Sequence, residues 1–124
     1  MTAAVDPEAL VKRYLSTVAT GTAEDVAALY AEDATLEDPV GCGEIHIGRQ
    51  AIAGFYKNTE AAEIETEILH LRVGGHEAAF MFAITVTMGE AKMRIEPIEV
   101  MTFNGAGEVT SMKAYWGPGD ITQL

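Results

Sequence analysis

The second half of the chain consists of apolar segments separated by glycine-containing turns, and this pattern constrains the fold most. The segments cover 64–73, 78–88, 92–103 and 109–116, and the turns contain Gly74-Gly75, Gly89-Glu90 and Asn104-Gly105-Ala106-Gly107. Alternating apolar residues bounded by such turns predict strands joined as hairpins. We therefore expect a curved, mainly antiparallel sheet, with 92–103 as one long strand and the tail 117–124 as a loop.

The first half carries three helical patterns. Asp6-Pro7 combines a capping residue with a proline at the first helical position, and Thr22 to Asp25 resembles a capping box. Gly48 opens the third helix, whose apolar stripe ends at Tyr56. The sequence predicts one α+β domain over 1–124, with three N-terminal helices packed on one face of the sheet in a cone-shaped fold.

Composition narrows the classes of partner. The chain has 124 residues with 48% hydrophobic content, enough for one domain with a core and an enclosed pocket. The net charge of -11 argues against nucleic acid and anionic membranes, which reward clusters of Lys and Arg. No apolar stretch approaches the roughly 20 residues of a membrane span. The start of the chain, 1–6, lacks the pattern of a secretory signal, so we expect a cytoplasmic protein.

A carboxylate ends the short strand predicted at 34–38. Because strand side chains alternate, Ala34, Leu36 and Asp38 share one face, and Pro39 then ends regular pairing. Two interpretations fit this pattern. Asp38 starts a turn, as Asp-Pro often does, or its carboxylate faces the mouth of a pocket.

A second carboxyl group interrupts an apolar row on the strand predicted at 92–103. The row is Met93, Ile95, Pro97, Glu99, Met101 and Phe103. Burial among such side chains should raise the pKa of Glu99, because it disfavours the charged form. Remaining mostly neutral at pH 7 takes a rise of about three units, roughly 4 kcal/mol, which a fold tolerates more readily if the protonated acid has a use. Alternatively, Glu99 pairs with a cation or lies where the sheet frays.

Three apolar helical stripes end in a phenol, at Tyr14, Tyr30 and Tyr56. Each by itself is typical of an amphipathic core residue. Tyr115 and Trp116 end the last strand, and one of them must face the interior. With the two carboxyl groups, these residues predict an apolar cavity that holds a few polar groups, which is the usual composition of a small-molecule site.

With these residues in place, the sequence resembles the ketosteroid isomerases over nearly its whole length. The matching segments are 13–14, 29–39, 45–49, 55–56, 98–105 and 111–116. The segment 29–39 is common to the wider fold shared with nuclear transport factor 2 and some polyketide cyclases. The combination of Tyr14, Asp38 and an acid at Glu99 is more specific to the isomerases.

The resemblance implies a steroid delta-isomerase that moves the double bond of a delta-5-3-ketosteroid into conjugation through a dienolate. Asp38 would be the general base, and Tyr14 and a protonated Glu99 would donate hydrogen bonds to the dienolate oxygen. The supporting and substrate-lining residues that it implies are Tyr30, Tyr56, Phe82 and Trp116. It also implies a homodimer, no cofactor and a small apolar ketone as substrate.

One departure from the family pattern concerns Glu99, where the isomerases have aspartic acid. Either the longer side chain reaches the substrate oxygen with its stem folded back, or it crowds the pocket and changes the choice of substrate. Misplacement by about 1 Å can cost a large factor in rate. The residue therefore tests how closely the chain follows the family.

Two alternatives remain open on sequence grounds. The first is another enzyme on the same fold, such as a polyketide cyclase or an epoxide hydrolase. The hydrolase would need an arginine between two acids, and Arg94 shares the strand face of Glu96, not that of Glu99. The second is a non-catalytic module that binds a steroid-like ligand, in which Asp38 could be replaced by Asn without loss.

Other chemistry-bearing residues predict no further site. The histidines His46, His70 and His76 lack the spacing of zinc ligands, so we expect surface or edge positions and no metal. Cys42 has no evident base partner, and a single cysteine excludes an internal disulfide. Ile98 and Val100, on the strand face opposite Glu99, are candidates for contact between subunits.

Overall fold

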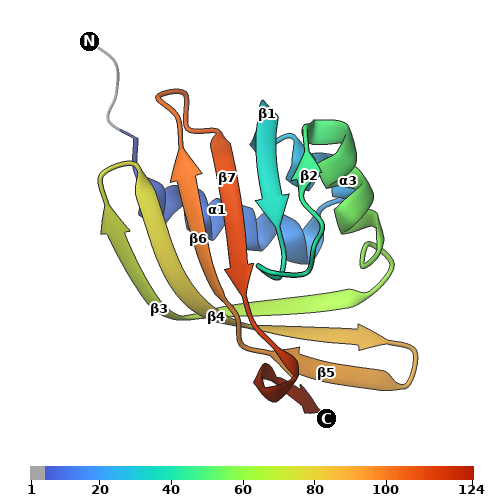
Figure 1. The fold of residues 1–124 in the computed structure, drawn as a ribbon. Coiled ribbons are helices and arrows are strands. Elements are labelled where there is room, and N and C mark those ends of the chain that lie inside the picture. Colours follow the sequence, from blue (N-terminus) through green and yellow to red (C-terminus); the bar gives the residue numbers. More distant parts are fainter. Residues whose placement is uncertain (1–4) are drawn as a thin grey trace.

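The computed structural model describes residues 5–124, which form three α-helices against one curved sheet (Figure 1). The helices are α1 (Pro7–Thr20), α2 (Ala23–Ala27) and α3 (Arg49–Lys57). The strands are β1 (Tyr30–Glu37), β2 (His46–Ile47), β3 (Glu63–Gly74), β4 (Glu77–Met88), β5 (Ala91–Ile95), β6 (Ile98–Phe103), β7 (Val109–Tyr115) and β8 (Ile121–Gln123). The predicted α+β class is confirmed.

Strand pairing is antiparallel except at one place. The sheet order is β2-β1-β7-β6-β4-β5-β8, and β3 pairs with β4. The parallel pair is β1 with β7, which brings the end of β1 beside the last long strand. Residues about 75 positions apart in the sequence, such as Leu36 and Met112, are therefore neighbours.

The helix starts follow the predicted capping chemistry. Asp6 Oδ1 accepts a hydrogen bond from the Ala9 backbone N–H at 3.3 Å. Thr22 and Asp25 form the predicted capping box, with reciprocal bonds of 3.1 and 2.9 Å. Gly48 precedes α3 with a φ of 88°, and an added Cβ there would lie 3.4 Å from the Glu32 carbonyl oxygen. The turn into α3 therefore favours glycine.

The prediction of one long strand over 92–103 is wrong, because β5 and β6 are separated by Glu96 and Pro97. Proline lacks the N–H that a ladder needs, so pairing is interrupted there. Both strands still pair with β4, which is longer than either. The register with β4 is unchanged across the break, because Ile95 pairs with Ile84 and Ile98 with Met81, so the alternation of faces continues from β5 into β6.

The tail is also more ordered than predicted. Residues Pro118–Asp120 form a 3₁₀ turn, and β8 then pairs with β5 in the register Ile95 with Ile121. The Leu124 backbone N–H extends this ladder by donating to the Lys92 carbonyl at 2.9 Å. An edge strand offers unpaired backbone groups, and the tail satisfies those of β5. The predicted loop is therefore corrected to a short helix and an edge strand.

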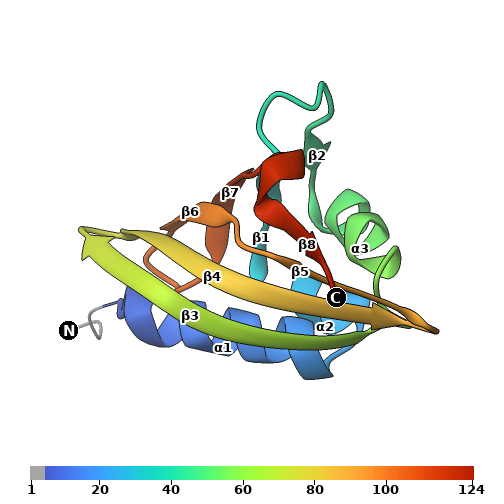
Figure 2. The same cartoon turned by 90° about the horizontal axis from the view of Figure 1, so that it is seen from below.

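The concave side of the sheet holds the core and leaves a cavity. Helix α1 packs against β3 and β4, while α3 packs against α2 and β1 (Figure 2). The largest fully buried side chains are Tyr30, Phe80, Leu36, Ile52, Met101, Met112 and Val11. These side chains lie between the concave side of the sheet and the helices, and they pack the two layers together.

Two sequence-based expectations concern the membrane and the chain start. Among residues 5–124, no helix is both long and apolar enough to cross a membrane. The expected lack of a secretory signal falls largely on residues 1–4, which lie outside the described residues.

Candidate active site

A cavity of about 220 Å³ lies between α1, α3 and the concave side of the sheet. Its lining residues are Tyr14, Leu15, Val18, Asp38, Phe55, Tyr56, Thr59, Phe82, Ile84, Val86, Met93, Ile95, Pro97, Glu99 and Trp116. Most of the wall is apolar, and the polar groups are few. Of the predicted site residues, Tyr30 is the one that does not line it.

Asp38 follows directly after β1 and shares the face of Leu36, which is fully buried. Its Oδ1 atom accepts a hydrogen bond of 2.6 Å from the indole Nε1 of Trp116. Burial raises the pKa of Asp38, and the Trp116 hydrogen bond and the charge of His46 act in the opposite direction. Asp38 is therefore a partly desolvated carboxyl group at the cavity, which is the placement that a general base needs.

Glu99 lies in the middle of β6, opposite Phe80 on one side and Ala114 on the other. Its side chain is almost completely buried, with 3% exposure, and Oε1 has no hydrogen-bond partner among the described residues. Burial raises the pKa of Glu99 well above its usual value, the charge of Asp38 raises it further, and Tyr14 partly offsets the rise. A cation partner or a frayed strand does not fit this environment.

The three predicted tyrosines form one hydrogen-bonded cluster. The Tyr56 hydroxyl lies 2.7 Å from the Tyr14 hydroxyl and 2.7 Å from the Tyr30 hydroxyl. Burial raises the pKa of all three phenols, so they stay neutral. Tyr14 thus enters the cavity as a neutral donor, while Tyr56 and Tyr30 hold it in place.

The hydrogen bond between Trp116 and Asp38 was not predicted from the sequence. The two residues are 78 positions apart, and alternation indicated only that Tyr115 or Trp116 faces inward. The parallel pairing of β1 with β7 brings the two strand ends together. No local sequence signal contains that information.

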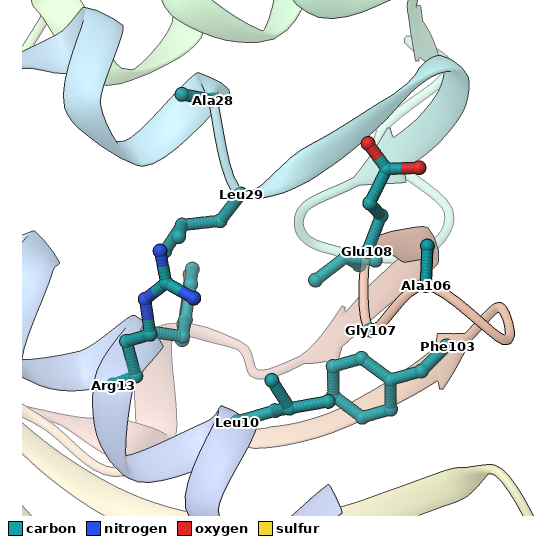
Figure 3. A pocket seen from close by; sticks show the side chains of 10 residues that line it. Leu10, Arg13, Ala28, Leu29, Phe103, Ala106, Gly107 and Glu108 are labelled. Carbon is teal, nitrogen blue, oxygen red and sulfur yellow. The ribbon is translucent and has the colours of Figure 1, made fainter. Parts of the chain in front are cut away.

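A second hollow of about 190 Å³ lies elsewhere against α1, and we call it the outer hollow (Figure 3). Its lining residues are Leu10, Arg13, Tyr14, Ala28, Leu29, Phe103, Ala106, Gly107, Glu108 and Val109. Both carboxylate oxygens of Glu108 are occupied, one by Arg49 at 2.8 Å and the other by Asn104 at 3.0 Å. The outer hollow therefore presents no unpartnered acid, in contrast to the cavity at Glu99.

Within residues 5–124, no group of three or more His, Cys, Asp and Glu side chains is arranged to hold a metal ion. Cys42 is a free and exposed thiol, and His70 and His76 are exposed. His46 lies on the edge strand β2 and is only partly exposed.

Comparisons with known proteins agree with this architecture. The SnoaL-like domain matches residues 11–112. A protein from Nocardioides simplex named steroid Delta-isomerase is 48% identical over 114 residues, covering 92% of each chain.

Two solved structures have the same fold. The epoxide hydrolase/cyclase-like enzyme SalBIII, studied for pyran ring formation in the polyether salinomycin, matches with a TM-score of 0.86 and 29% identity over 95% of each chain. RV0760c from Mycobacterium tuberculosis matches over 100% of both chains with a TM-score of 0.90 and 20% identity, a likeness of fold alone.

The match over residues 11–112 shows that the chain belongs to the SnoaL-like domain family. Within that family, the extent and identity of the Nocardioides match place the chain among the steroid Delta-isomerases. The resemblance to the ketosteroid isomerases that the sequence indicated is confirmed.

Proposed function

We propose that the protein isomerises a delta-5-3-ketosteroid to its conjugated delta-4 isomer by intramolecular proton transfer. One observation carries the proposal: Asp38, Glu99 and Tyr14 all line the same apolar cavity, and Glu99 has an oxygen with no partner there. The named relative from Nocardioides supports a steroid as the substrate class.

The reaction needs one base and two donors. The Asp38 carboxylate removes a proton from the carbon beside the ketone, and the electron pair moves onto the ketone oxygen to form a dienolate. Tyr14 and protonated Glu99 donate hydrogen bonds to that oxygen. Asp38 then returns the proton two carbons further along, so the product is an isomer and no co-reactant is consumed.

The electrostatic setting favours this assignment. Burial keeps both donors neutral, because it raises the pKa of Tyr14 and that of Glu99. Neutral donors in a site with little water stabilise a developing oxyanion more strongly than water does, and one such donor is worth about a hundredfold or more in rate. The Trp116 hydrogen bond keeps the Asp38 carboxylate in position between its two proton transfers.

The deciding experiment mixes the purified protein with a delta-5-3-ketosteroid and follows the ultraviolet absorbance of the conjugated enone. We expect turnover in the wild type and a loss of about a thousandfold or more in Asp38→Asn, since general base catalysis contributes about 10² to 10⁴. Asp33→Asn is the matched control, because Asp33 is exposed on β1, the strand that Asp38 follows. Steroid binding without turnover would contradict isomerisation and favour a binding module.

The hydrolase alternative is disfavoured by the cavity wall. An epoxide hydrolase of the expected kind needs an arginine between its two acids, and no arginine lines the cavity of the described residues. Arg94 instead lies 3.6 Å from Glu96 in an ion pair on the other strand face. SalBIII remains a relative of similar shape, and its chemistry is not assigned to this chain.

We also propose a homodimer formed through the outer face of the sheet. Ile98 is 41% exposed there and Val100 is partly exposed, both on the side of β6 that points away from Glu99. Sedimentation analysis should show a dimer that Ile98→Glu weakens, and a wild-type monomer would overturn the proposal. The cytoplasmic location stays a prediction, tested by fractionation.

A further inference from the structure

Arg49 lies outside the cavity wall, at the start of α3, and it holds the first residue of β1. Its Nε donates a hydrogen bond of 2.7 Å to the Tyr30 backbone carbonyl. The preceding Gly48 backbone N–H donates to the Ala34 carbonyl, further along the same strand, at 2.8 Å. Strand β2 pairs with β1 only beyond this point. The arginine side chain therefore provides the partner that the carbonyl of a fully buried residue needs.

The other arm of the guanidinium is fixed by Glu108. Arg49 Nη2 donates to Glu108 Oε2 at 2.8 Å, and Asn104 Nδ2 donates to the second carboxylate oxygen at 3.0 Å. Asn104 Oδ1 in turn accepts a hydrogen bond of 3.0 Å from the Glu108 backbone N–H. A planar guanidinium with two fixed acceptors has little freedom to move. Arg49 therefore fixes the start of α3 relative to the start of β1.

The helix α3 by itself gives no reason for a cation at its first position. Gly48 provides no side-chain cap, and the first turn of α3 contains no acidic residue. A positive charge near a helix N-terminus opposes the helix dipole. The contacts of Arg49 with β1 and with Glu108 therefore account for the arginine better than helix stability does.

The two elements that Arg49 joins carry the phenols that hold Tyr14. Tyr56 lies seven positions after Arg49 on α3, which is two turns along the same face. Its hydroxyl is 2.7 Å from the Tyr14 hydroxyl and 2.7 Å from the Tyr30 hydroxyl. A shift of α3 relative to β1 would therefore disturb the bond between Tyr56 and Tyr30, and with it the partner of Tyr14.

We propose that Arg49 is a positioning residue for Tyr14: it fixes α3 on β1, so that Tyr56 and Tyr30 keep the Tyr14 hydroxyl in place at the cavity. The kinetic consequence rests on the proposed function, in which Tyr14 is a donor to the substrate oxygen. Misplacement by about 1 Å can cost about a hundredfold in rate. We expect a smaller displacement of the phenol, and a loss of about tenfold, when the Arg49 contacts are removed.

The kinetic test combines Arg49→Met with Tyr14→Phe in the full chain. Methionine keeps an unbranched, flexible side chain and removes the donors. We expect kcat on the ketosteroid to fall about tenfold in Arg49→Met with little change in KM, the result of losing an interaction made in the transition state. In the Tyr14→Phe background the same substitution should cost less than about twofold, because no hydroxyl is left to position. An equal cost in both backgrounds would indicate general damage to the site and overturn the proposal.

A second measurement does not depend on turnover. Hydrogen-bonded hydroxyl protons of buried tyrosines give separate ¹H NMR signals, and the variants Tyr14→Phe, Tyr30→Phe and Tyr56→Phe assign them. Arg49→Met should shift the signals of Tyr30 and Tyr56. Unchanged signals would mean that the tyrosine cluster keeps its geometry without the arginine, which would overturn the proposal.

Two substitutions are matched controls. Lys57→Gln removes a cation at the other end of α3 that pairs with Glu24 at 3.2 Å, and it should change neither kcat nor the hydroxyl signals. Glu108→Gln keeps an oxygen that accepts from Arg49 and leaves the bond to Tyr30 in place, so the signals should again be unchanged. If Arg49→Met does not fold, Arg49→Lys replaces it, because an ammonium group lacks the planar fork that holds both acceptors.

Failure of this proposal and failure of the proposed function give different results. Shifted hydroxyl signals in Arg49→Met, without steroid turnover in the wild type, would support the role of Arg49 in the tyrosine cluster and reject the isomerase. Turnover in the wild type, with unshifted signals and an unchanged kcat in Arg49→Met, would do the reverse.

Discussion

The cavity and the outer hollow are two spaces of similar size that share the ring of Tyr14 but differ in how their acids are satisfied. Their volumes are about 220 and 190 Å³. In the cavity, Glu99 is buried and Oε1 lacks a partner. In the outer hollow, Arg49 and Asn104 occupy both oxygens of Glu108.

Volume alone therefore does not identify the candidate active site, because the two spaces are of similar size. An unpartnered buried polar group costs about 1 to 3 kcal/mol, and the proposed bond from Glu99 to a substrate oxygen would offset that cost. Glu108, with its partners in place, ties the turn between β6 and β7 to the start of α3. We therefore expect substitutions in the cavity to change chemistry and those in the outer hollow to change stability only.

Among the substitutions that test this comparison, the largest effect is expected at Tyr14, the residue that both spaces share. Tyr14→Phe keeps the ring that forms the common wall and removes the hydroxyl that enters the cavity, so kcat should fall by about 10² to 10³. Steady-state kinetics on the ketosteroid measures this fall. Tyr115→Phe is the control, because Tyr115 is exposed at the end of β7. An unchanged kcat in Tyr14→Phe would mean that the shared wall, not the hydroxyl, matters.

The next effect concerns Glu99 and is measured as a change in the free energy of unfolding. Burial raises the pKa of Glu99 in the folded protein. The contribution of Glu99 to the free energy of unfolding is therefore fully present below its unfolded-state pKa and is lost as the pH rises toward its folded-state pKa. In that window the unfolding free energy of the wild type should fall, relative to Glu99→Gln, by about 1.4 kcal/mol per pH unit. Urea unfolding from pH 4.5 upward, a range set by the ordinary glutamate value of about 4.3, measures the slope. Glu99→Asp keeps the ionisable group and should keep the slope, whereas a flat difference for Glu99→Gln would show that Glu99 is ionised in the folded protein.

A smaller effect is expected from the indole that donates to the base. Trp116→Phe removes the 2.6 Å hydrogen bond to Asp38 and keeps an aromatic wall. Because that bond lowers the pKa of Asp38, its loss should move the acid limb of the kcat/KM profile upward by about one unit. Activity should then drop by up to about tenfold on the acid limb of the profile and recover at pH values above that limb. An unmoved limb would mean that the bond does not persist in solution.

The smallest effect is expected in the outer hollow. Glu108→Gln weakens a half-exposed ion pair with Arg49, so the unfolding free energy should drop by at most about 1 kcal/mol. Turnover should stay within about twofold of the wild type, because Glu108 is absent from the cavity wall. A tenfold loss of turnover without a loss of stability would break the comparison and assign the outer hollow a role in catalysis.

Sequence reasoning placed the two acids well because strand alternation is local. Asp38 follows Leu36 by two positions, and Glu99 follows Pro97 by two, so their faces are determined by neighbours in the chain. The error at 92–103 did no harm to this placement, since the register with β4 is the same on both sides of the interruption, where Ile95 pairs with Ile84 and Ile98 with Met81. The helix starts were equally predictable, because caps involve residues three or four positions apart.

The sequence by itself determined the α+β class, the helix starts and the face on which each carboxyl group lies. Only the tertiary structure decided which groups meet: Trp116 with Asp38, Tyr56 between Tyr14 and Tyr30, and β8 on the edge of β5. The reason is physical. Alternation and capping depend on backbone geometry over a few residues, whereas these contacts depend on strand order and register, which the whole chain sets when it buries its apolar faces together.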